Sequence, residues 1–217
     1  MMRHLQKLGK ALFLPVAILP ICGILMGLGY AMAPGAMGVP DAATSGALYT
    51  IGFFLIKAGG ALIDNMALLF AVGVAVGLAD DNDGTAGLAG LVSWLMITNL
   101  LSTGVVSTIA PNMFEWADGA LVNTASKVAF DKIANPFIGI LCGIIGATCY
   151  NKFKNTKLPD VLAFFGGKRS VAIVTGVVSI VVAAILLFVW PIVFGVLVAM
   201  ATASRTWVCS ALAFTLS

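Results

Sequence analysis

The chain has 217 residues, of which 60% are hydrophobic and only 10% charged, with a mean hydropathy of +1.06. Water-soluble domains usually carry about 25% charged residues, so this composition excludes a soluble, disordered, collagen-like or disulfide-stapled secreted chain. The net charge of +3 is too small to indicate a nucleic-acid partner. The apolar runs are continuous rather than alternating, which favours helices over a barrel. We therefore expect an all-α polytopic membrane protein whose solvent is the lipid bilayer.

The amino terminus predicts a short amphipathic helix followed by a first membrane span. Residues 1–10 carry Arg3, Lys7 and Lys10, and an apolar stretch then runs from 11 to 32. This stretch is too long for the apolar region of a cleavable signal peptide, which has about 7–15 residues. Basic residues concentrate in cytoplasmic loops, so we expect a cytoplasmic amino terminus and place residues 33–45 outside.

The next segment, 46–79, is too long for one upright helix. We divide it at Gly59 and Gly60, so that residues 46–58 lie along the interface or re-enter the membrane and a second span covers 61–79. The polar run 80–84 then forms a tight turn on the cytoplasmic side.

Three more spans are predicted at 85–107, 134–150 and 170–195, the last with a break at Trp190 and Pro191. The connection 108–133 is expected outside. Residues 151–169 hold the strongest basic cluster of the chain. The four spans that precede it place it in the cytoplasm, as the basic-loop rule requires. The sequence thus predicts about five transmembrane helices plus interfacial or re-entrant segments.

Paired glycines four residues apart occur in three predicted spans. Such spacing places both glycines on one helix face and allows two helices to approach closely in lipid. Apolar, glycine-rich helices also produce this spacing by chance, and both interpretations stay open. The candidate packing residues are Gly23, Gly27, Gly73, Gly77, Gly139 and Gly143.

Asp64 and Asn65 are the most costly polar residues predicted within a span. Buried ionisable groups in membranes often line a solute pathway, which makes both residues candidates for substrate binding. Alternatively, Asp64 caps the helix after the glycine break and pairs with Lys57.

Lys168 and Arg169 follow two glycines, but the motif of a phosphate-binding loop is incomplete here. Their charge either sets the topology or forms a docking surface for an anionic partner domain. The aspartates of 80–84 also lack the spacing of a calcium loop. His4 is the only histidine and Glu115 the only glutamate, so the sequence indicates no catalytic residue, no metal site and no cofactor.

Four blocks of sequence carry a family resemblance: 5–32, 54–92, 136–153 and 157–173. In content, order and spacing they resemble the IIC membrane component of the bacterial phosphotransferase system, of the glucose and N-acetylglucosamine type. The resemblance covers about residues 4–195, the amino-terminal portion of that component. The tetrad at 63–66 and the block at 137–149 are more similar to the N-acetylglucosamine branch than to the glucose branch.

The resemblance implies a homodimeric permease of the bacterial cytoplasmic membrane. Such a permease binds a sugar outside and presents it to a phosphorylated cysteine of a cytoplasmic IIB partner, fused or separate. It also implies that residues 11–195 form the scaffold and dimer half, whereas the family's sugar-binding histidine and glutamate blocks lie further along. Neither block occurs in these 217 residues, so the resemblance transfers no catalytic or sugar-binding residue to this chain.

The tail 196–217 departs from the family pattern, which continues as a glycine-rich helix. A two-nucleotide frame shift of suitable codons for residues 206–217 restores that pattern, so we expect a frameshift between about residues 200 and 207 and a truncated product. The alternative function is a non-catalytic oligomeric membrane scaffold or a channel-like protein.

Overall fold

The computed structural model describes residues 2–39, 45–81, 83–113, 116–117, 120–121, 125–156 and 167–215. These residues form α-helices, short 3-10 turns and one pair of two-residue strands. The chain divides into two units. The first unit comprises Met1–Trp94 and Asn135–Gly176, and the second comprises Leu95–Ala134 and Val177–Ser217.

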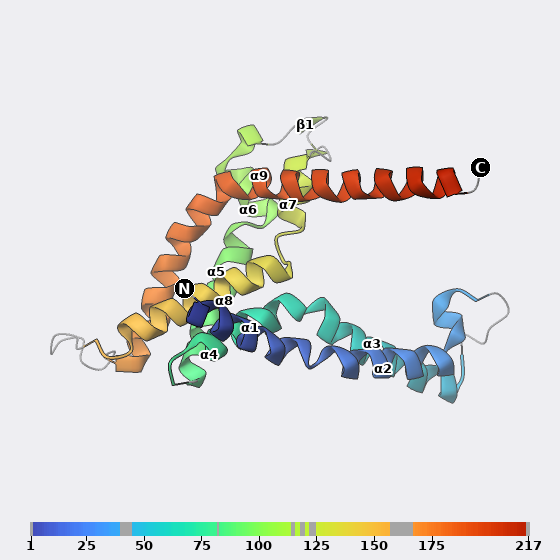
Figure 1. Cartoon of the computed structure of the whole chain (residues 1–217), viewed down its shortest axis with the longest axis horizontal. Helices are drawn as coiled ribbons and strands as arrows, with labels where there is room; N and C mark the ends of the chain where they lie inside the picture. Colours follow the sequence, from blue (N-terminus) through green and yellow to red (C-terminus); the bar gives the residue numbers. More distant parts are fainter. Residues whose placement is uncertain are drawn as a thin grey trace. The chain divides into compact units, whose positions relative to one another are not determined.

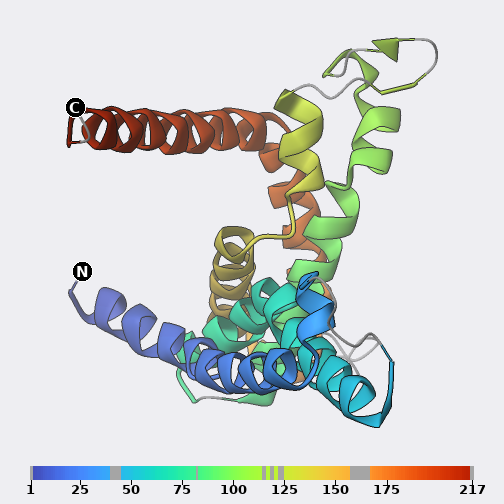
Figure 2. The ribbon, with the colours of Figure 1, turned by 90° about the vertical axis from the view of Figure 1, so that its right-hand side faces the viewer.

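The first unit begins with α1 (Met2–Val16) and α2 (Leu19–Met32), followed by the 3-10 turn η1 (Pro34–Met37). In Figures 1 and 2 the blue ribbon of α1 leads into α2 with little change of direction. Pro20 lies in the first turn of α2, where its missing N–H is tolerated. The predicted first span, 11–32, is therefore two helices separated at residues 17–18.

The next two helices are α3 (Ala47–Asp64) and α4 (Met66–Leu78). The predicted division at Gly59 and Gly60 is wrong, because α3 continues through both glycines and ends at Asp64. Asn65 lies between the two helices, and its side-chain Nδ2 donates to the Ala61 carbonyl oxygen at 2.8 Å. A glycine inside a helix costs only about 1 kcal/mol, which packing against a neighbouring helix readily offsets.

The remaining helices of the first unit are α5 (Gly84–Leu100, which continues into the second unit), α8 (Pro136–Phe153) and the start of α9 (Ser170–Thr215), preceded by η4 (Gly167–Arg169). The start of α8 is set by Asn135, whose side chain accepts a hydrogen bond from the Ile138 backbone N–H. Within this unit α2 packs along α3, and α4 packs along both α8 and α1.

The second unit contains α6 (Thr103–Ile109), η2 (Pro111–Met113), the strands β1 (Trp116–Ala117) and β2 (Ala120–Leu121), α7 (Ala125–Asp131) and most of α9. The strands pair antiparallel. Asp131 accepts hydrogen bonds from Thr103 Oγ1 at 2.6 Å and Lys127 Nζ at 2.8 Å. The Thr103 bond joins the start of α6 to the end of α7, and the Lys127 bond lies within α7.

Helix α9 shows that the predicted break at Trp190 and Pro191 is not a helix end. The helix runs through Pro191 to Thr215, and its ribbon changes direction within the orange-to-red part (Figure 1). A proline removes one backbone donor from a helix and favours a bend. Beside Pro191, Trp190 is buried and its indole Nε1 donates to the Ala129 carbonyl oxygen at 2.7 Å, which anchors α9 to α7.

The all-α polytopic membrane class is confirmed. In the described part of the chain, α3, α8 and the Ser170–Met200 stretch of α9 are long and apolar enough to cross a membrane. A fourth span is possible if α5 and α6, bent by 58°, act as one. Helices α2 and α4, at two of the predicted spans, are shorter apolar helices. Large apolar side chains lie exposed on α2, α3 and α9, as expected of surfaces that face lipid.

Candidate functional site

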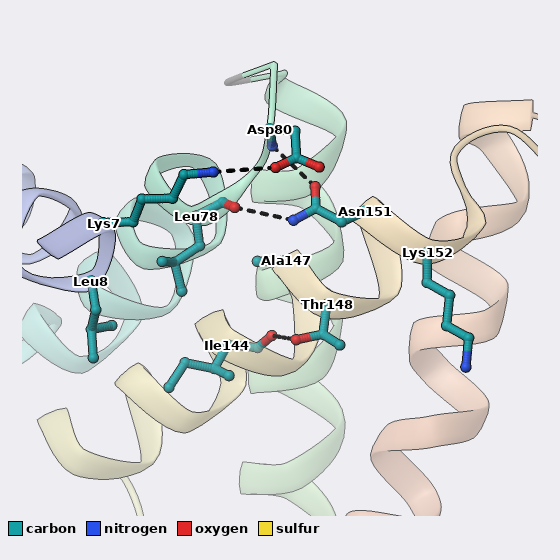
Figure 3. A pocket seen from close by; sticks show the side chains of 9 residues that line it. All are labelled: Lys7, Leu8, Leu78, Asp80, Ile144, Ala147, Thr148, Asn151 and Lys152. Carbon is teal, nitrogen blue, oxygen red and sulfur yellow. Dashed lines mark hydrogen bonds and ion pairs between the residues drawn. The ribbon is translucent and has the colours of Figure 1, made fainter. Parts of the chain in front are cut away.

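Three segments that the sequence analysis assigns to the same side of the membrane meet at the turn that follows α4. Lys7 Nζ lies 3.3 Å from Asp80 Oδ1, which ties α1 to this turn. The Asp80 backbone N–H donates to Asn151 Oδ1 at 3.0 Å, and Asn151 Nδ2 donates to the Leu78 carbonyl oxygen at 3.1 Å. Figure 3 shows this arrangement. The amide of Asn151 thus binds the backbone on both sides of the α4 end.

The end of α8 adds a cation and a phenol. Lys154 Nζ lies 3.9 Å from Asp80 Oδ2 and 3.7 Å from Asp81 Oδ2. The Tyr150 hydroxyl donates to Asp81 Oδ2 at 3.0 Å, and the Tyr150 side chain is fully buried. The aromatic ring of Tyr150 packs with Ala79, Ala86, Ala89 and Val171, so the phenol connects the apolar core to the charged turn.

Asp83 completes the cluster. Its carboxylate accepts a hydrogen bond from Lys168 Nζ and two more from Thr85, through the backbone N–H at 2.8 Å and the hydroxyl at 2.6 Å. The Lys168 ammonium, followed by the Thr85 donors, holds the pKa of Asp83 well below its ordinary value of 3.8. The same pair raises the pKa of Lys168.

We name this cluster the acidic-turn junction. It joins α1, the turn after α4, the end of α8 and η4. Each of its three carboxylates binds a lysine ammonium, and that of Asp81 also accepts from the Tyr150 hydroxyl. The sequence does not predict these pairs, although the basic-loop rule gives a signal, because the predicted topology places residues 1–10, 80–84 and 151–169 on one side of the membrane. The members of the junction are Lys7, Asp80, Asp81, Asp83, Tyr150, Asn151, Lys154 and Lys168.

The predicted docking residue Lys168 is thus paired with Asp83 of its own chain. Its side chain is 52% exposed, which leaves ammonium donors accessible to a partner even with Asp83 bound. The side chain of Arg169, the second predicted docking residue, lies outside the part of the chain whose side chains are described.

Asp64 and Asn65, the predicted substrate candidates, lie at the α3–α4 break and are both exposed. Asp64 is the last residue of α3 rather than a cap at the start of a helix. Within the described residues Lys57 lies over the Phe53 ring, with its Nζ 5.3 Å from the ring centroid, and no ion pair joins it to Asp64. Neither Asp64 nor Asn65 lines the grooves between α1, α4 and α8 or the cavity between α6 and α9.

The six candidate glycines divide into two groups. Gly73 and Gly77 face Pro15 and Ala11 of α1, and a Cβ added at Gly77 would lie 2.5 Å from the Cβ of Ala11. Added Cβ atoms at Gly139 and Gly143 would meet α4, the first of them only 2.2 Å from the Ala67 carbonyl oxygen.

Gly23 and Gly27 instead face open space, since an added Cβ at either position meets no described atom within 4 Å. The close contact of α2 with α3 is formed by Gly29, Gly52 and Gly59, which the four-residue spacing does not select. Gly52 and Gly59 are seven residues apart, two helical turns, and this spacing is the signal that could have identified them.

We expect the carboxyl of Asp83 to titrate well below 3.8, because protonation breaks its pair with Lys168. The stabilisation from the Asp83–Lys168 ion pair is therefore fully present above about pH 3.8, the ordinary pKa of the carboxyl. It is lost as the pH falls through the lowered pKa of Asp83 in the folded state. Carboxyl-selective NMR of the solubilised chain measures this midpoint. In Lys168→Gln the midpoint should move up toward 3.8.

Asp131 provides the internal control for this titration. Its own pKa is lowered by Lys127 and Thr103, and it should not respond to Lys168→Gln. An unchanged Asp83 midpoint in that variant would show that Lys168 is not its partner.

The comparison with known proteins agrees with the sequence resemblance. A sequence model of the family described as "Phosphotransferase system, EIIC" matches residues 9–217, nearly the whole chain and including the tail 196–217. A protein of Staphylococcus carnosus strain TM300, the "PTS system glucoside-specific EIICBA component", is 41% identical over 198 residues. That alignment covers 87% of this chain but only 28% of the relative, so the chain spans little more than a quarter of that protein. The chain belongs to the EIIC family of the phosphotransferase system.

Proposed function

We propose that this chain is part of a sugar permease that imports a glucopyranose-type sugar while a phosphorylated IIB partner phosphorylates it. The observation that carries the proposal is the family match over residues 9–217, together with helices long enough to span the membrane. The same match favours a permease over the alternative of a non-catalytic scaffold or channel-like protein.

The sugar itself is proposed as a class. The resemblance implies glucose or N-acetylglucosamine, and the name of the 41% identical relative adds glucosides. All three contain a six-membered glucopyranosyl ring. We assign residues 11–195 to the scaffold and dimer part, so that sugar selectivity resides in other parts of the permease and Asp64 and Asn65 stay weak candidates for sugar contact.

The acidic-turn junction supports a cytoplasmic amino terminus. Lys7, Lys154 and Lys168 come from three segments and meet at the same turn, and basic residues favour the cytoplasmic side. We place the IIB partner on this side, where Lys168 offers an exposed cation. The name of the relative, an EIICBA component, indicates that IIC, IIB and IIA parts occur in one protein there. This supports a IIB partner for the present chain, fused or separate.

We also propose a homodimer. The open face of Gly23 and Gly27 supports it, because small residues on the uncovered face of an apolar helix allow close approach of a second copy. The described chain packs its other candidate glycines internally.

A chimera tests the function. Residues 9–217 of this chain replace the matching segment of the S. carnosus EIICBA protein, and uptake of labelled glucose, N-acetylglucosamine and an aryl glucoside is measured with and without phosphoenolpyruvate. We expect uptake that depends on phosphoenolpyruvate, within about tenfold of the parent, with the parent's order of sugar preference.

The control is the same chimera carrying Gly139→Val, in which uptake should fall along with the amount of stably folded protein in the membrane. A chimera that is present in the membrane at the parent's level, is monodisperse in detergent and yet transports none of the three sugars would refute the proposal.

A further inference from the structure

An open groove lies beside the acidic-turn junction, between α1, the end of α4 and the end of α8 (Figure 3). Its volume is about 580 Å³, and its floor is formed by the apolar side chains of Leu8, Leu78, Ile144 and Ala147. The hydroxyl of Thr148, which also lines the groove, donates to the Ile144 carbonyl oxygen at 2.7 Å. The floor therefore presents hydrocarbon and has no free hydroxyl donor.

The polar rim of the groove includes an accessible cation, Lys7. The Asn151 amide is used on both sides by the backbone of Asp80 and Leu78. Asp80 already faces the ammonium groups of Lys7 and Lys154. Lys7 is 54% exposed, and an ammonium has three donors, so its pair with Asp80 leaves it able to bind a second anion.

Two more lysines make the neighbourhood positive. Lys152 lines the groove, is exposed and forms no ion pair among the described residues. Figure 3 shows its side chain extending from α8 away from Lys7, so it adds to the potential rather than to the same contact. Lys10, one helical turn after Lys7, lines an adjoining groove of about 490 Å³ that shares Lys7 and Asp80. The lysines along the two grooves and their rim outnumber the aspartates there: Lys7, Lys10, Lys152 and Lys154 against Asp80 and Asp81.

We propose that this groove binds one anionic phospholipid, with the phosphate at Lys7 and the first acyl methylenes on the apolar floor. The groove lies at the end of α8, a helix of membrane-spanning length whose last turn carries Lys152. Lipid phosphates lie at this level of a spanning helix, and basic pockets between membrane helices bind anionic headgroups.

A soluble organophosphate uses the same cation but not the floor. Such a compound binds Lys7 but leaves Leu8 and Ile144 exposed to water. The acyl chain of a lipid covers both side chains, and each Å² of apolar surface removed from water contributes about 25 cal/mol to the binding free energy. A zwitterionic lipid also covers the floor, but its headgroup has no net charge, so its electrostatic attraction to the lysines is weaker. The combination of an apolar floor with a net positive rim selects an anionic lipid.

Native mass spectrometry of the detergent-solubilised chain tests the proposal without any dependence on sugar transport. The chain is titrated with phosphatidylglycerol and with phosphatidylethanolamine of equal acyl chains, and glycerol 3-phosphate serves as competitor. We expect one phosphatidylglycerol per chain to bind at least about fivefold more tightly than phosphatidylethanolamine. Glycerol 3-phosphate should not displace it at equal concentration.

Two variants locate the site. Lys7→Gln should weaken phosphatidylglycerol binding about fivefold, the contribution of one lysine near an anionic lipid. Thr148→Trp fills the groove at an exposed position without removing a charge, and it should abolish the bound lipid. Lys57→Gln, on α3 and outside the groove, removes the same charge and should bind as the parent does.

The outcomes separate the possible ligands. Equal binding of the two lipids, or an equal loss in Lys7→Gln and Lys57→Gln, would overturn the proposal, since the charge would then act without a site. Displacement by glycerol 3-phosphate at equal concentration would assign the groove to a soluble phosphate compound and would also overturn it. Binding that survives Thr148→Trp would place the lipid elsewhere.

Discussion

Replacing Gly139 by valine is expected to lower the free energy of unfolding by about 3 kcal/mol, the upper end of the usual cost of overpacking. A Cβ at this position would lie 2.2 Å from the carbonyl oxygen of Ala67 and 3.0 Å from its carbonyl carbon. Both are backbone atoms of α4, so no side-chain rotation relieves the clash and the two helices must separate. Denaturant titration of the solubilised protein, followed by circular dichroism, measures the change.

Gly23→Val is the matched control for this substitution. It adds the same side chain at a glycine where a Cβ meets nothing within 4 Å, so the fold of one chain should be unaffected. Under the proposed dimer, the same variant should shift a crosslinking series from dimer toward monomer. Unfolding of Gly139→Val at the parent's denaturant concentration would contradict the close α4–α8 contact.

Replacing Trp190 by alanine should cost about 3–5 kcal/mol, the range for deleting a large buried aromatic side chain. Trp190 is only 1% exposed, and its indole N–H donates to the carbonyl oxygen of Ala129, which is itself fully buried. The variant therefore leaves a cavity and an unpaired acceptor in the second unit. The unfolding transition measured by circular dichroism should move to a clearly lower denaturant concentration.

Trp190→Phe separates the two contributions. It keeps most of the aromatic volume and removes only the indole donor, so its cost should be about 1–3 kcal/mol, that of an unsatisfied buried acceptor. If alanine and phenylalanine have equal effects, packing of the ring contributes nothing to stability, which would contradict the buried position of Trp190.

The membrane class, the helical content and the family were predictable from the sequence because they depend on composition and on long ordered blocks. The helix boundaries were less so. The dividing glycines, Gly59 and Gly60, reduce helix propensity locally, but Gly59 contacts Met26 and Cys22 of α2. Tertiary packing thus overrides propensity in α3, and the break occurs at Asn65.

Glycine spacing identifies a helix face but does not say whether that face meets a neighbour in the same chain. Gly139 and Gly23 belong to the same pattern, yet one touches α4 and the other faces open space. The groove shows the same limit, since Leu8 and Ile144 are 136 positions apart in the sequence and only the fold brings them to one cavity.

The acidic-turn junction also imposes an order on biosynthesis. Lys7 leaves the ribosome before Asp80, so their pair can form as soon as the turn emerges. Lys168 follows Asp83 by 85 residues, which at about 5–20 residues per second corresponds to about 4–17 s of translation. During that interval Lys168 has not been made, and among the described residues Thr85 is the partner left to Asp83, so its carboxylate has no lysine partner until Lys168 follows.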